Sequence, residues 1–333
     1  MGKQVAVAFL LIFLIFFLPF LWGEADVLPA VPPAGDAAQP PVPDTDPAPT
    51  RYDASATITV LLDGQAQQMD LQTYLMGVVR AEMPAAFELE ALKAQAVAAR
   101  TYTLHKIANG GSANHPDADA CNDIGCCQAF KSYEDAAAGW GVDAQAFEEK
   151  IRQAVEDTDG ECILYEGEPV LAVFHSSSAG VTQDASAVWS ESLPYLQSVE
   201  TPESAETVPN YCSTVSFSAE ELKNKLQAAL PEANLSGSPS NWFTNMRQEP
   251  NGTVTAVSVG GVTVSGTKLR AILELRSACF TVSFDGGTVT FSVTGYGHGV
   301  GMSQYGANVL AADGMGYQEI LTWYYTGTAI GRP

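Results

Sequence analysis

The stretch that decides the fold runs from Tyr74 to Leu104 and reads YLMGVVRAEMPAAFELEALKAQAVAARTYTL. A helix is expected to begin at Asp70 as its N-cap and to end at about Met83, because Pro84 disfavours helical geometry in the residue before it. A second helix is expected from about 88 to 107, and its many alanines allow neighbouring backbone to approach closely. This second segment is therefore predicted to be a packed central helix.

The first predicted helix carries a carboxylate on its apolar face. Glu82 continues, at helical spacing, a stripe that must face the core. The stripe consists of Leu71, Leu75 and Val78. A negative charge in the last turn of a helix interacts unfavourably with the helix macrodipole, and burial also disfavours the charged form of a carboxyl group. Both effects should raise the pKa of Glu82. A carboxyl group that stays partly protonated near neutral pH suits a general acid, whereas the plain alternative is a surface glutamate at a frayed helix end.

One face of the second predicted helix places polar groups among small residues. By the same spacing rule this face consists of Ala91, Gln95, Ala98 and Tyr102. A buried amide that is satisfied by its neighbours is the alternative to a binding role for Gln95.

Segments before and after the helices have strand character. Residues 56–62 are followed by an Asp63-Gly64 turn and a short segment before Asp70, which predicts a hairpin. Later segments alternate or run apolar between Gly and Asp turns, namely residues 162–165, 169–174, 253–259 and 281–293. With 333 residues, 46% of them hydrophobic, the chain can bury a large core. We expect an α+β fold with antiparallel strands, as one large domain or as two interlocked lobes with a substrate groove between them.

The N-terminus has the pattern of a membrane anchor. Residues 5–22 form an unbroken uncharged apolar run that follows Lys3 and precedes acidic residues, so residues 1–23 are predicted to span the membrane once. The rest of the chain would then lie outside the cytoplasmic membrane. Gly23-Glu24-Ala25 resembles a cleavage site, so a removed signal peptide stays open as the alternative. No cysteine follows closely enough for a lipoprotein.

Residues 24–55 are dominated by Pro, Ala and Asp, a composition that cannot bury a core and favours extended geometry. We interpret them as a spacer ahead of an extracytoplasmic domain at 56–333. The formal net charge of -22 would repel nucleic-acid phosphates, so nucleic-acid binding is not expected and a neutral or cationic substrate fits better.

A loop-like segment after the second helix concentrates one histidine and three cysteines. The four candidate ligands are His115, Cys121, Cys126 and Cys127. Soft ligands at this density suit tetrahedral zinc, and four protein ligands would make a closed, structural site. The alternative for an exported protein is disulfide bonding with Cys162, Cys212 and Cys279 as further partners, although Cys162 lies in an apolar strand-like stretch typical of core.

The glycine-rich stretch GYGHGVGMSQYG at 295–306 lacks the Gly-Lys-Ser/Thr ending of a phosphate-binding loop, so nucleotide binding is not expected. Its glycines allow the backbone to lie close to a ligand or to a neighbouring helix, and both possibilities stay open.

Four long collinear motifs in this chain resemble the stage II sporulation protein D family, whose other branch contains amidase enhancers. The motifs are the stretch quoted above, FHSSSAGVTQDASAVW (174–189), PYLQSVE (194–200) and GYGHGVGMSQYGANVLAADGMGYQEILTWYYTGTAI (295–330). The resemblance covers about residues 56–331. It implies a lytic transglycosylase that cleaves between N-acetylmuramic acid and N-acetylglucosamine in peptidoglycan strands without stem peptides, during engulfment of the forespore, and leaves 1,6-anhydro ends.

The resemblance also implies roles for particular residues. Glu82 stands in the family's Glu-Met-Pro motif as the catalytic glutamate, so one carboxyl group would serve as both acid and base. Candidate sugar contacts are Lys93, Gln95, Arg100, His298, Ser303 and Gln304. Some family members are similar at the cysteine cluster but have His where this chain has Cys126, and thiolate can replace imidazole there.

The implied partners are a peptidoglycan amidase (SpoIIP-like) and a membrane protein that anchors the complex (SpoIIM-like), at the mother-cell membrane of a sporulating bacterium. Two rival functions stay open. One is a non-catalytic wall-binding enhancer of an amidase, as in the other branch of the family. The other is a zinc-dependent amidase that uses the cysteine-rich cluster for its chemistry.

Overall fold

The computed structural model describes residues 51–189 and 192–333, which belong to one compact unit at 49–333. The predicted membrane anchor at 1–23 and most of the predicted spacer at 24–55 lie outside the described residues. Across the described ranges, no helix has both the length and the apolar character that a membrane span requires.

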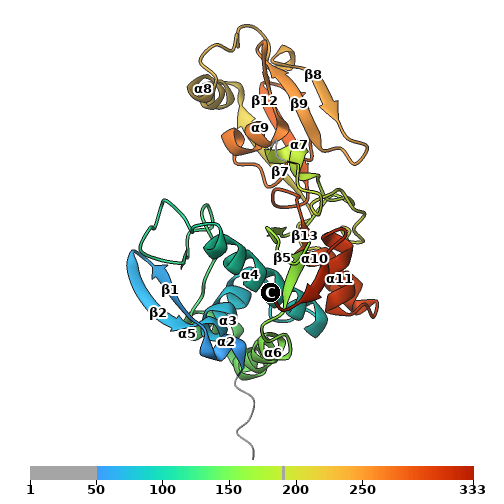
Figure 1. The fold of residues 1–333 in the computed structure, drawn as a ribbon. Helices are drawn as coiled ribbons and strands as arrows, with labels where there is room; N and C mark the ends of the chain where they lie inside the picture. The colour runs from blue at the N-terminus through green and yellow to red at the C-terminus, as the bar shows by residue number, and fades with distance from the viewer. Residues whose placement is uncertain (1–50, 190–191) are drawn as a thin grey trace, which may run out of the picture. The chain divides into compact units, whose positions relative to one another are not determined.

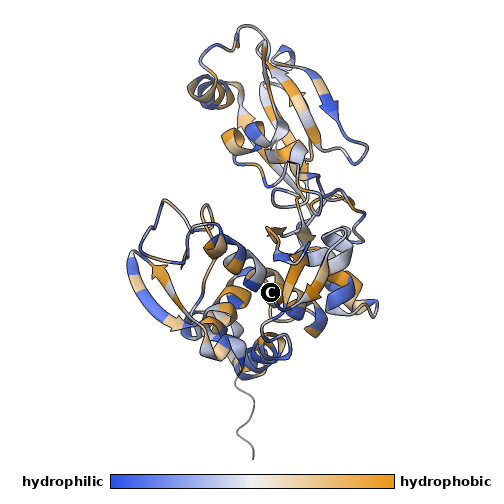
Figure 2. Ribbon diagram, viewed as in Figure 1, coloured by the Kyte–Doolittle hydropathy of each residue, from blue (hydrophilic) through white to orange (hydrophobic). Residues whose placement is uncertain are grey.

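The predicted hairpin is confirmed. After the short helix α2 (Tyr52–Ser55), strand β1 (Thr57–Leu62) pairs antiparallel with β2 (Gln65–Asp70), and Asp63 and Gly64 turn with φ of 49° and 82°. Positive φ at both positions matches the twist that a two-residue hairpin needs. Figure 2 shows β1 as the apolar strand and β2 as the polar one, since β2 faces solvent.

Both predicted central helices are confirmed within about a residue at each end. Helix α3 (Leu71–Glu82) begins where the Asp70 carboxylate accepts the Thr73 N–H at 2.8 Å, and it ends at Met83, which is extended before Pro84. Helix α4 (Leu89–Ala108) follows and is largely buried. The helices that pack around α3 and α4 are α5 (Tyr133–Trp140), α6 (Ala144–Asp157), α10 (Gln304–Ala312) and α11 (Tyr317–Tyr324) (Figure 1), and a 3-10 turn (Gly141–Asp143) joins α5 to α6.

Short strands complete this part of the molecule. Strand β3 (Ala120–Cys121) pairs parallel with β1, and β4 (Cys162–Tyr165) lies between β14 (Ala329–Gly331) and β5 (Glu168–Pro169). Strands β6 (Phe174–His175) and β13 (Met302–Ser303) pair in parallel, and helix α7 (Ala185–Trp189) follows β6 along the chain. The strand expected at 169–174 is wrong in its middle. Residues 170–173 are irregular because the two ends pair with different partners.

Residues 212–294 form a second part with its own core. It contains β7 (Cys212–Ser218), α8 (Ala219–Ala229), a 3-10 turn (Pro239–Asn241), β8 (Phe243–Gln248), β9 (Val254–Val259), β10 (Val262–Val264), α9 (Gly266–Leu273), β11 (Phe280–Asp285) and β12 (Thr288–Thr294). The strands form two antiparallel sheets, in the orders β10-β9-β8 and β11-β12-β7. The single strand expected at 281–293 is a hairpin, because Gly286 and Gly287 turn with φ of 52° and 92°.

The apolar side chains form two clusters, which match these two parts. The first cluster draws on residues 58–196 and again on 300–325, and the second on residues 222–293. The second core is therefore formed by a segment that is inserted between the two stretches of chain that form the first core. This confirms the α+β fold class and shows how two interlocked parts arise from one chain.

Candidate functional site

Glu82 ends α3 in a partly buried position. The stripe below it is as predicted, since Leu71, Leu75 and Val78 are fully buried. The backbone N–H of Ala129 donates to Glu82 Oε1 at 2.8 Å. Burial raises the pKa of Glu82, and the hydrogen bonds from Ala129 and Gln304 oppose this only in part. The direction of the shift agrees with the sequence-based expectation and is the one that a general acid requires.

Two buried amides accompany this carboxyl group. Gln304 Nε2 donates to Gln95 Oε1 at 3.2 Å, and the Gln304 side chain is near enough to Glu82 to lower the pKa of that carboxyl. Gln95 Nε2 is buried without a hydrogen-bond partner among the described residues. A buried donor without a partner costs about 1–3 kcal/mol, so a ligand or a water that accepts from it would be favoured here. The structure thus brings together Glu82, Gln95 and Gln304 from α3, α4 and α10.

Ser303 holds the start of α10 and is fully buried. Its hydroxyl accepts the Gly306 N–H at 3.2 Å as an N-cap and donates to Glu203 Oε1 at 2.6 Å. Both hydrogen bonds of the hydroxyl go to protein partners, and the sugar contact expected for Ser303 stays a prediction. Ser303 also acts on the site indirectly, since Gln304 is the first residue of the helix that it caps.

Glu203 is a buried residue that the sequence did not single out. Its carboxylate accepts the Ser178 N–H at 2.7 Å and the hydroxyls of Ser303 and Thr201. Gly306 has no room for a side chain, because a Cβ there would lie 2.5 Å from Glu203 Oε2. Glu203 lies in an irregular segment with no periodic pattern, so no feature of the sequence marked it.

Arg100, another expected sugar contact, also has protein partners. Its side chain is fully buried, and the guanidinium is paired with Asp53 and donates to the carbonyl of Glu161 at 3.0 Å. A guanidinium enclosed in this way holds α2 against α4 and presents no surface to a sugar. Lys93, another cation on α4, forms ion pairs with Glu90 at 2.9 Å and with Asp157 at 3.2 Å.

His298 lies in the glycine-rich loop between two other rings. Its ring centroid is 5.6 Å from that of His175 and 5.2 Å from that of Trp189, and its Nδ1 accepts the Val300 N–H at 3.1 Å. Burial lowers the pKa of His298 to about 4, so the ring is neutral near pH 7. It lines a pocket together with Ser177, Ser178 and other residues, and it remains a candidate for a sugar contact.

The glycines of this loop are explained by a neighbouring segment of the chain. A Cβ at Gly301 would lie 2.1 Å from the Val173 carbonyl oxygen, and one at Gly297 would lie 2.6 Å from His175 Cβ. Both glycines have positive φ, of 70° and 123°. The close neighbour at these positions is therefore the irregular residue Val173 and strand β6, and not the helix that was expected as the alternative to a ligand.

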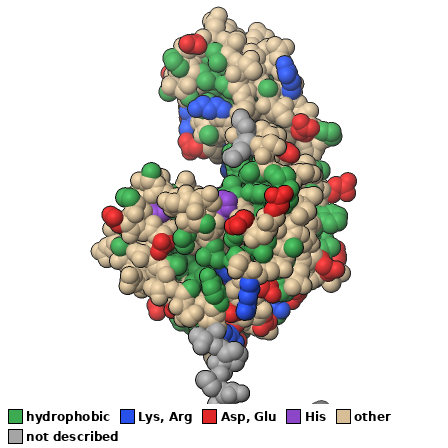
Figure 3. All heavy atoms as spheres, in the orientation of Figure 1, with side chains coloured by type: hydrophobic (Ala, Val, Ile, Leu, Met, Phe, Trp, Pro, Cys, Tyr) green, Lys and Arg blue, Asp and Glu red, His purple; other side chains and the backbone are tan. Residues whose placement is uncertain are grey.

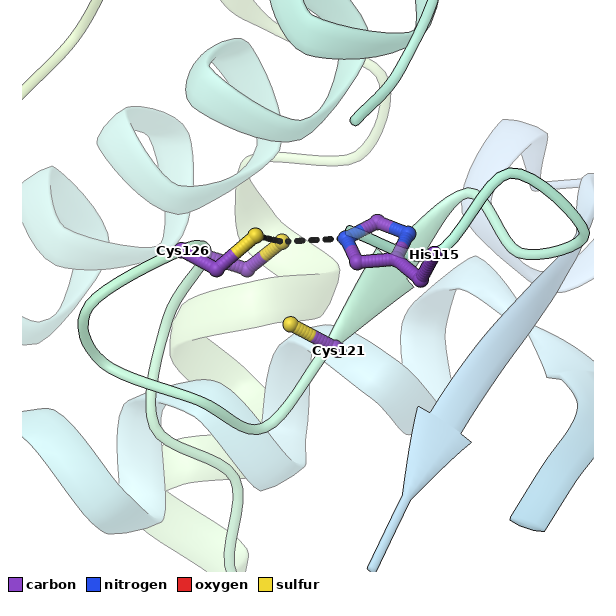
Figure 4. Close-up of side chains that lie close together, drawn as sticks. His115, Cys121 and Cys126 are labelled. Atoms are coloured by element: carbon purple, nitrogen blue, oxygen red, sulfur yellow. Dashed lines mark hydrogen bonds between the residues drawn. The ribbon is translucent and has the colours of Figure 1, made fainter. Parts of the chain in front are cut away.

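The histidine and three cysteines form one cluster at the end of α4. The ligand atoms of His115, Cys121, Cys126 and Cys127 all lie within 4.8 Å of one another. Figure 4 shows the first three of these side chains turned toward one another. His115 Nδ1–H donates to the Ala118 carbonyl at 2.9 Å, which leaves the Nε2 lone pair facing the sulfurs, as in histidines that bind metals.

The donor set fits a tetrahedral divalent metal such as zinc. All six cysteines lie in the described ranges and all are free thiols, so the disulfide alternative is not what the structure contains. Cys162 is fully buried in β4, as expected for a core residue.

Acidic side chains are scattered over the face shown in Figure 3, with few lysines and arginines between them. This distribution agrees with the formal net charge of -22.

These features define an α+β protein with two cores, a buried acid beside two amides at a helix end, and a His/Cys cluster that could hold a metal. Comparison with known proteins places this combination in a family. A family model described as stage II sporulation protein matches residues 64–165. The chain is 36% identical over 266 residues to stage II sporulation protein D of Bacillus subtilis (strain 168), which covers 80% of this chain and 76% of that protein.

Two further relatives agree. Stage II sporulation protein D of Bacillus amyloliquefaciens is also 36% identical, over 80% of this chain and 75% of its own length. The amidase enhancer of Bacillus subtilis (strain 168) is 30% identical over 308 residues, which cover 77% of this chain and 40% of the enhancer. The chain belongs to the stage II sporulation protein D family.

Proposed function

We propose that this protein is a lytic transglycosylase that cuts peptidoglycan glycan strands between N-acetylmuramic acid and N-acetylglucosamine, with Glu82 as its acid and base. The observation that carries the proposal is the Glu82 cluster. A partly buried carboxyl group with a raised pKa stands beside Gln304 and Gln95, and one amide N–H has no partner among the described residues. The membership in the family supports the reaction class.

The reaction needs one carboxyl group in two successive roles. Protonated Glu82 gives its proton to the bridging glycosidic oxygen as the bond from that oxygen to C1 of the muramic sugar breaks. The resulting carboxylate takes the proton of the C6 hydroxyl of the same sugar, and the C6 oxygen bonds to C1. The products are a free N-acetylglucosamine end and a 1,6-anhydro end, and Glu82 is again protonated. No water is consumed, unlike in ordinary glycoside hydrolysis.

The amides are suited to place the sugar and to tune the acid. Gln304 stands at the first position of α10, which the Ser303 cap holds in place, and its side chain lowers the pKa of Glu82. Gln95 Nε2 has no hydrogen-bond partner among the described residues, but its side chain is fully buried, so it can donate to a sugar oxygen only after the amide becomes exposed. Lys93, Arg100 and Ser303 have protein partners in the structure, so the proposal relies on Gln95, Gln304 and His298 for sugar contacts.

The setting follows from the family and from the N-terminal sequence. We propose a single-pass anchor at 1–23, a spacer at 24–55 and an extracytoplasmic catalytic domain at 56–333, located at the mother-cell membrane. The substrate is glycan from which stem peptides have been removed. The proposed partners are the amidase that removes those peptides and a membrane protein that anchors the complex.

We propose that the cluster of His115, Cys121, Cys126 and Cys127 binds a structural zinc. The argument is the count of ligands, because a catalytic zinc keeps a position open for water or substrate and this cluster supplies four donors. A bound metal would tie the loop after α4 to β3. Zinc takes no part in the proposed reaction.

The test is the product formed from denuded glycan by the full-length chain. Mass spectrometry should detect 1,6-anhydro-muramic ends with the wild-type protein. Glu82→Gln should reduce their rate of formation by at least about 100-fold, since the amide can neither give nor take the proton. Glu88→Gln, an exposed glutamate six residues further along the chain, is the matched control and should keep the wild-type rate.

Two outcomes would contradict the proposal. Anhydro ends formed by Glu82→Gln at the wild-type rate would remove the acid from the mechanism. The second function, a wall-binding enhancer of an amidase, rests on the 30% identity to the amidase enhancer. It would be supported if neither wild type nor variant made anhydro ends and both still increased the rate of an added peptidoglycan amidase.

A further inference from the structure

Lys106 is a cation that the structure holds against the sulfur cluster. It lies in the last turn of α4, and its Nζ is 2.9 Å from Cys127 Sγ and 3.6 Å from Cys126 Sγ. The same ammonium donates to the Cys126 carbonyl, and its Nζ lies 6.0 Å from the centroid of the Tyr102 ring. Its position at the C-terminal end of a helix also suits a positive charge.

The charge of the proposed metal site explains why a cation belongs there. A zinc ion with one neutral imidazole and three thiolates carries a net charge of about -1, whereas two imidazoles and two thiolates would make it neutral. Cys121 and His115 are buried, and Cys126 and Cys127 are half-buried, so this charge is only partly compensated by water. An ammonium in hydrogen-bonding contact with a thiolate compensates it and also fixes the direction of the sulfur.

We propose that Lys106 is the counter-charge of a zinc site with three thiolates, and that it secures metal affinity without itself binding the metal. This inference rests on the proposed structural zinc and adds to it a residue outside the ligand set. It assigns to the last turn of α4 a direct link with the loop that carries the four ligands. In this arrangement, the Cys126 thiolate adds the third negative charge to the site and Lys106 compensates it. The contribution of Lys106 to zinc affinity therefore depends on the presence of the Cys126 thiolate.

The pairing can be tested on the full-length protein by measuring zinc affinity in competition with a chromogenic chelator. Lys106→Met keeps most of the length of the side chain and removes its charge, and we expect a 10- to 100-fold loss of zinc affinity, as for other residues that contact metal ligands. Lys106→Arg should retain most of the affinity. Lys223→Met, an exposed lysine on α8, is the matched control and should bind zinc like the wild type.

A double-mutant cycle isolates the charge. In Cys126→His the site becomes neutral, so adding Lys106→Met to that variant should change zinc affinity by less than about 3-fold. A loss in the double variant as large as in Lys106→Met alone would overturn the proposal, because the lysine would then act on the fold and not on the charge. Equal affinity of Lys106→Met and wild type would also overturn it.

Two controls keep the result interpretable. If Lys106→Met fails to fold, as judged by circular dichroism, Lys106→Gln replaces it with a polar neutral side chain. A wild-type protein that binds no zinc would overturn both the structural zinc and this inference, while the formation of anhydro ends would be judged separately. Substitution with Co²⁺ gives an independent readout, because thiolate ligation produces charge-transfer absorption that should be retained in Lys106→Arg.

Discussion

Replacement of Arg100 separates a structural role from a sugar-binding role more sharply than any other single change. The side chains of Arg100 and Asp53 are 0% and 1% exposed, and Arg100 Nε lies 3.0 Å from both carboxylate oxygens. Two backbone carbonyls, of Glu161 and Val155, accept from the same guanidinium. Arg100→Met therefore removes one partner of a buried ion pair and leaves the carboxylate of Asp53 enclosed without a counter-charge.

The expected loss of stability is large. Breaking a buried pair by removing one partner costs about 3–5 kcal/mol. The carbonyls that lose their donor add to this cost unless water reaches them. Since domains unfold with about 5–15 kcal/mol in total, Arg100→Met should lower the urea midpoint and the melting temperature markedly, the latter by about 10 °C.

The double variant Asp53→Asn/Arg100→Met tests the reason for the loss. It removes both charges, so it should be more stable than Arg100→Met alone. The measurements are urea unfolding followed by circular dichroism and, below the melting temperature, binding of denuded glycan. The reasoning would be refuted if Arg100→Met were as stable as the wild type and instead lost glycan affinity, because the guanidinium would then be a sugar contact as the family resemblance implied.

Two further predictions concern Glu82 and the glycine-rich loop. Burial raises the pKa of Glu82, so the folded state favours the protonated carboxyl group. The protonated group therefore contributes to the free energy of unfolding below the pKa of glutamate in the unfolded chain, about 4.3. This contribution is lost as the pH rises through the higher pKa of Glu82 in the folded protein. Glu82→Gln should therefore gain in unfolding free energy relative to the wild type between pH 4 and pH 8, and a constant difference in urea titrations across that range would contradict the shift. The Cβ of Gly301→Ala would lie 2.1 Å from the Val173 carbonyl at a φ of 70°, whereas that of Gly64→Ala, at a φ of 82°, has nothing within 4 Å. Both variants should lose about 1–2 kcal/mol of unfolding free energy because alanine is strained at positive φ, and Gly301→Ala should lose at least 1 kcal/mol more from overpacking. Equal losses of stability in thermal melts would show that the close approach of Gly301 to Val173 does not affect stability.

Features of the fold that depend on neighbouring residues were predictable from the sequence. Asp70 caps α3 and Pro84 ends it, and both act within a few residues, so the helix boundaries follow from local chemistry. The Asp63-Gly64 turn fixed the first hairpin for the same reason. The strand expected at 169–174 was wrong because Phe174 pairs with Met302, and no local pattern reveals so distant a partner.

The same distinction applies to the site. The helical stripe identified Glu82 and predicted its raised pKa, because three apolar residues on the same helix place it. Arg100 and Ser303 were assigned to sugar by family motif, but their partners lie 47 and 100 residues away along the chain. A motif marks which residues matter, whereas burial and partners decide whether they face a ligand or the interior. Glu203 shows the reverse case, because it has no motif and still accepts three hydrogen bonds.

The pairing of β7 with β12 has a consequence for how this chain is built and varied. Cys212 pairs with Thr294, and the Gly295 N–H donates to the Tyr211 carbonyl at 2.8 Å. The two ends of the segment 212–294 therefore lie next to each other where the segment joins the rest of the chain. A module with adjoining ends can grow, shrink or be exchanged for a tight turn with little disturbance to its host. During synthesis, however, α10 and α11 emerge only after this module, so the Gln304 side of the candidate site is assembled last.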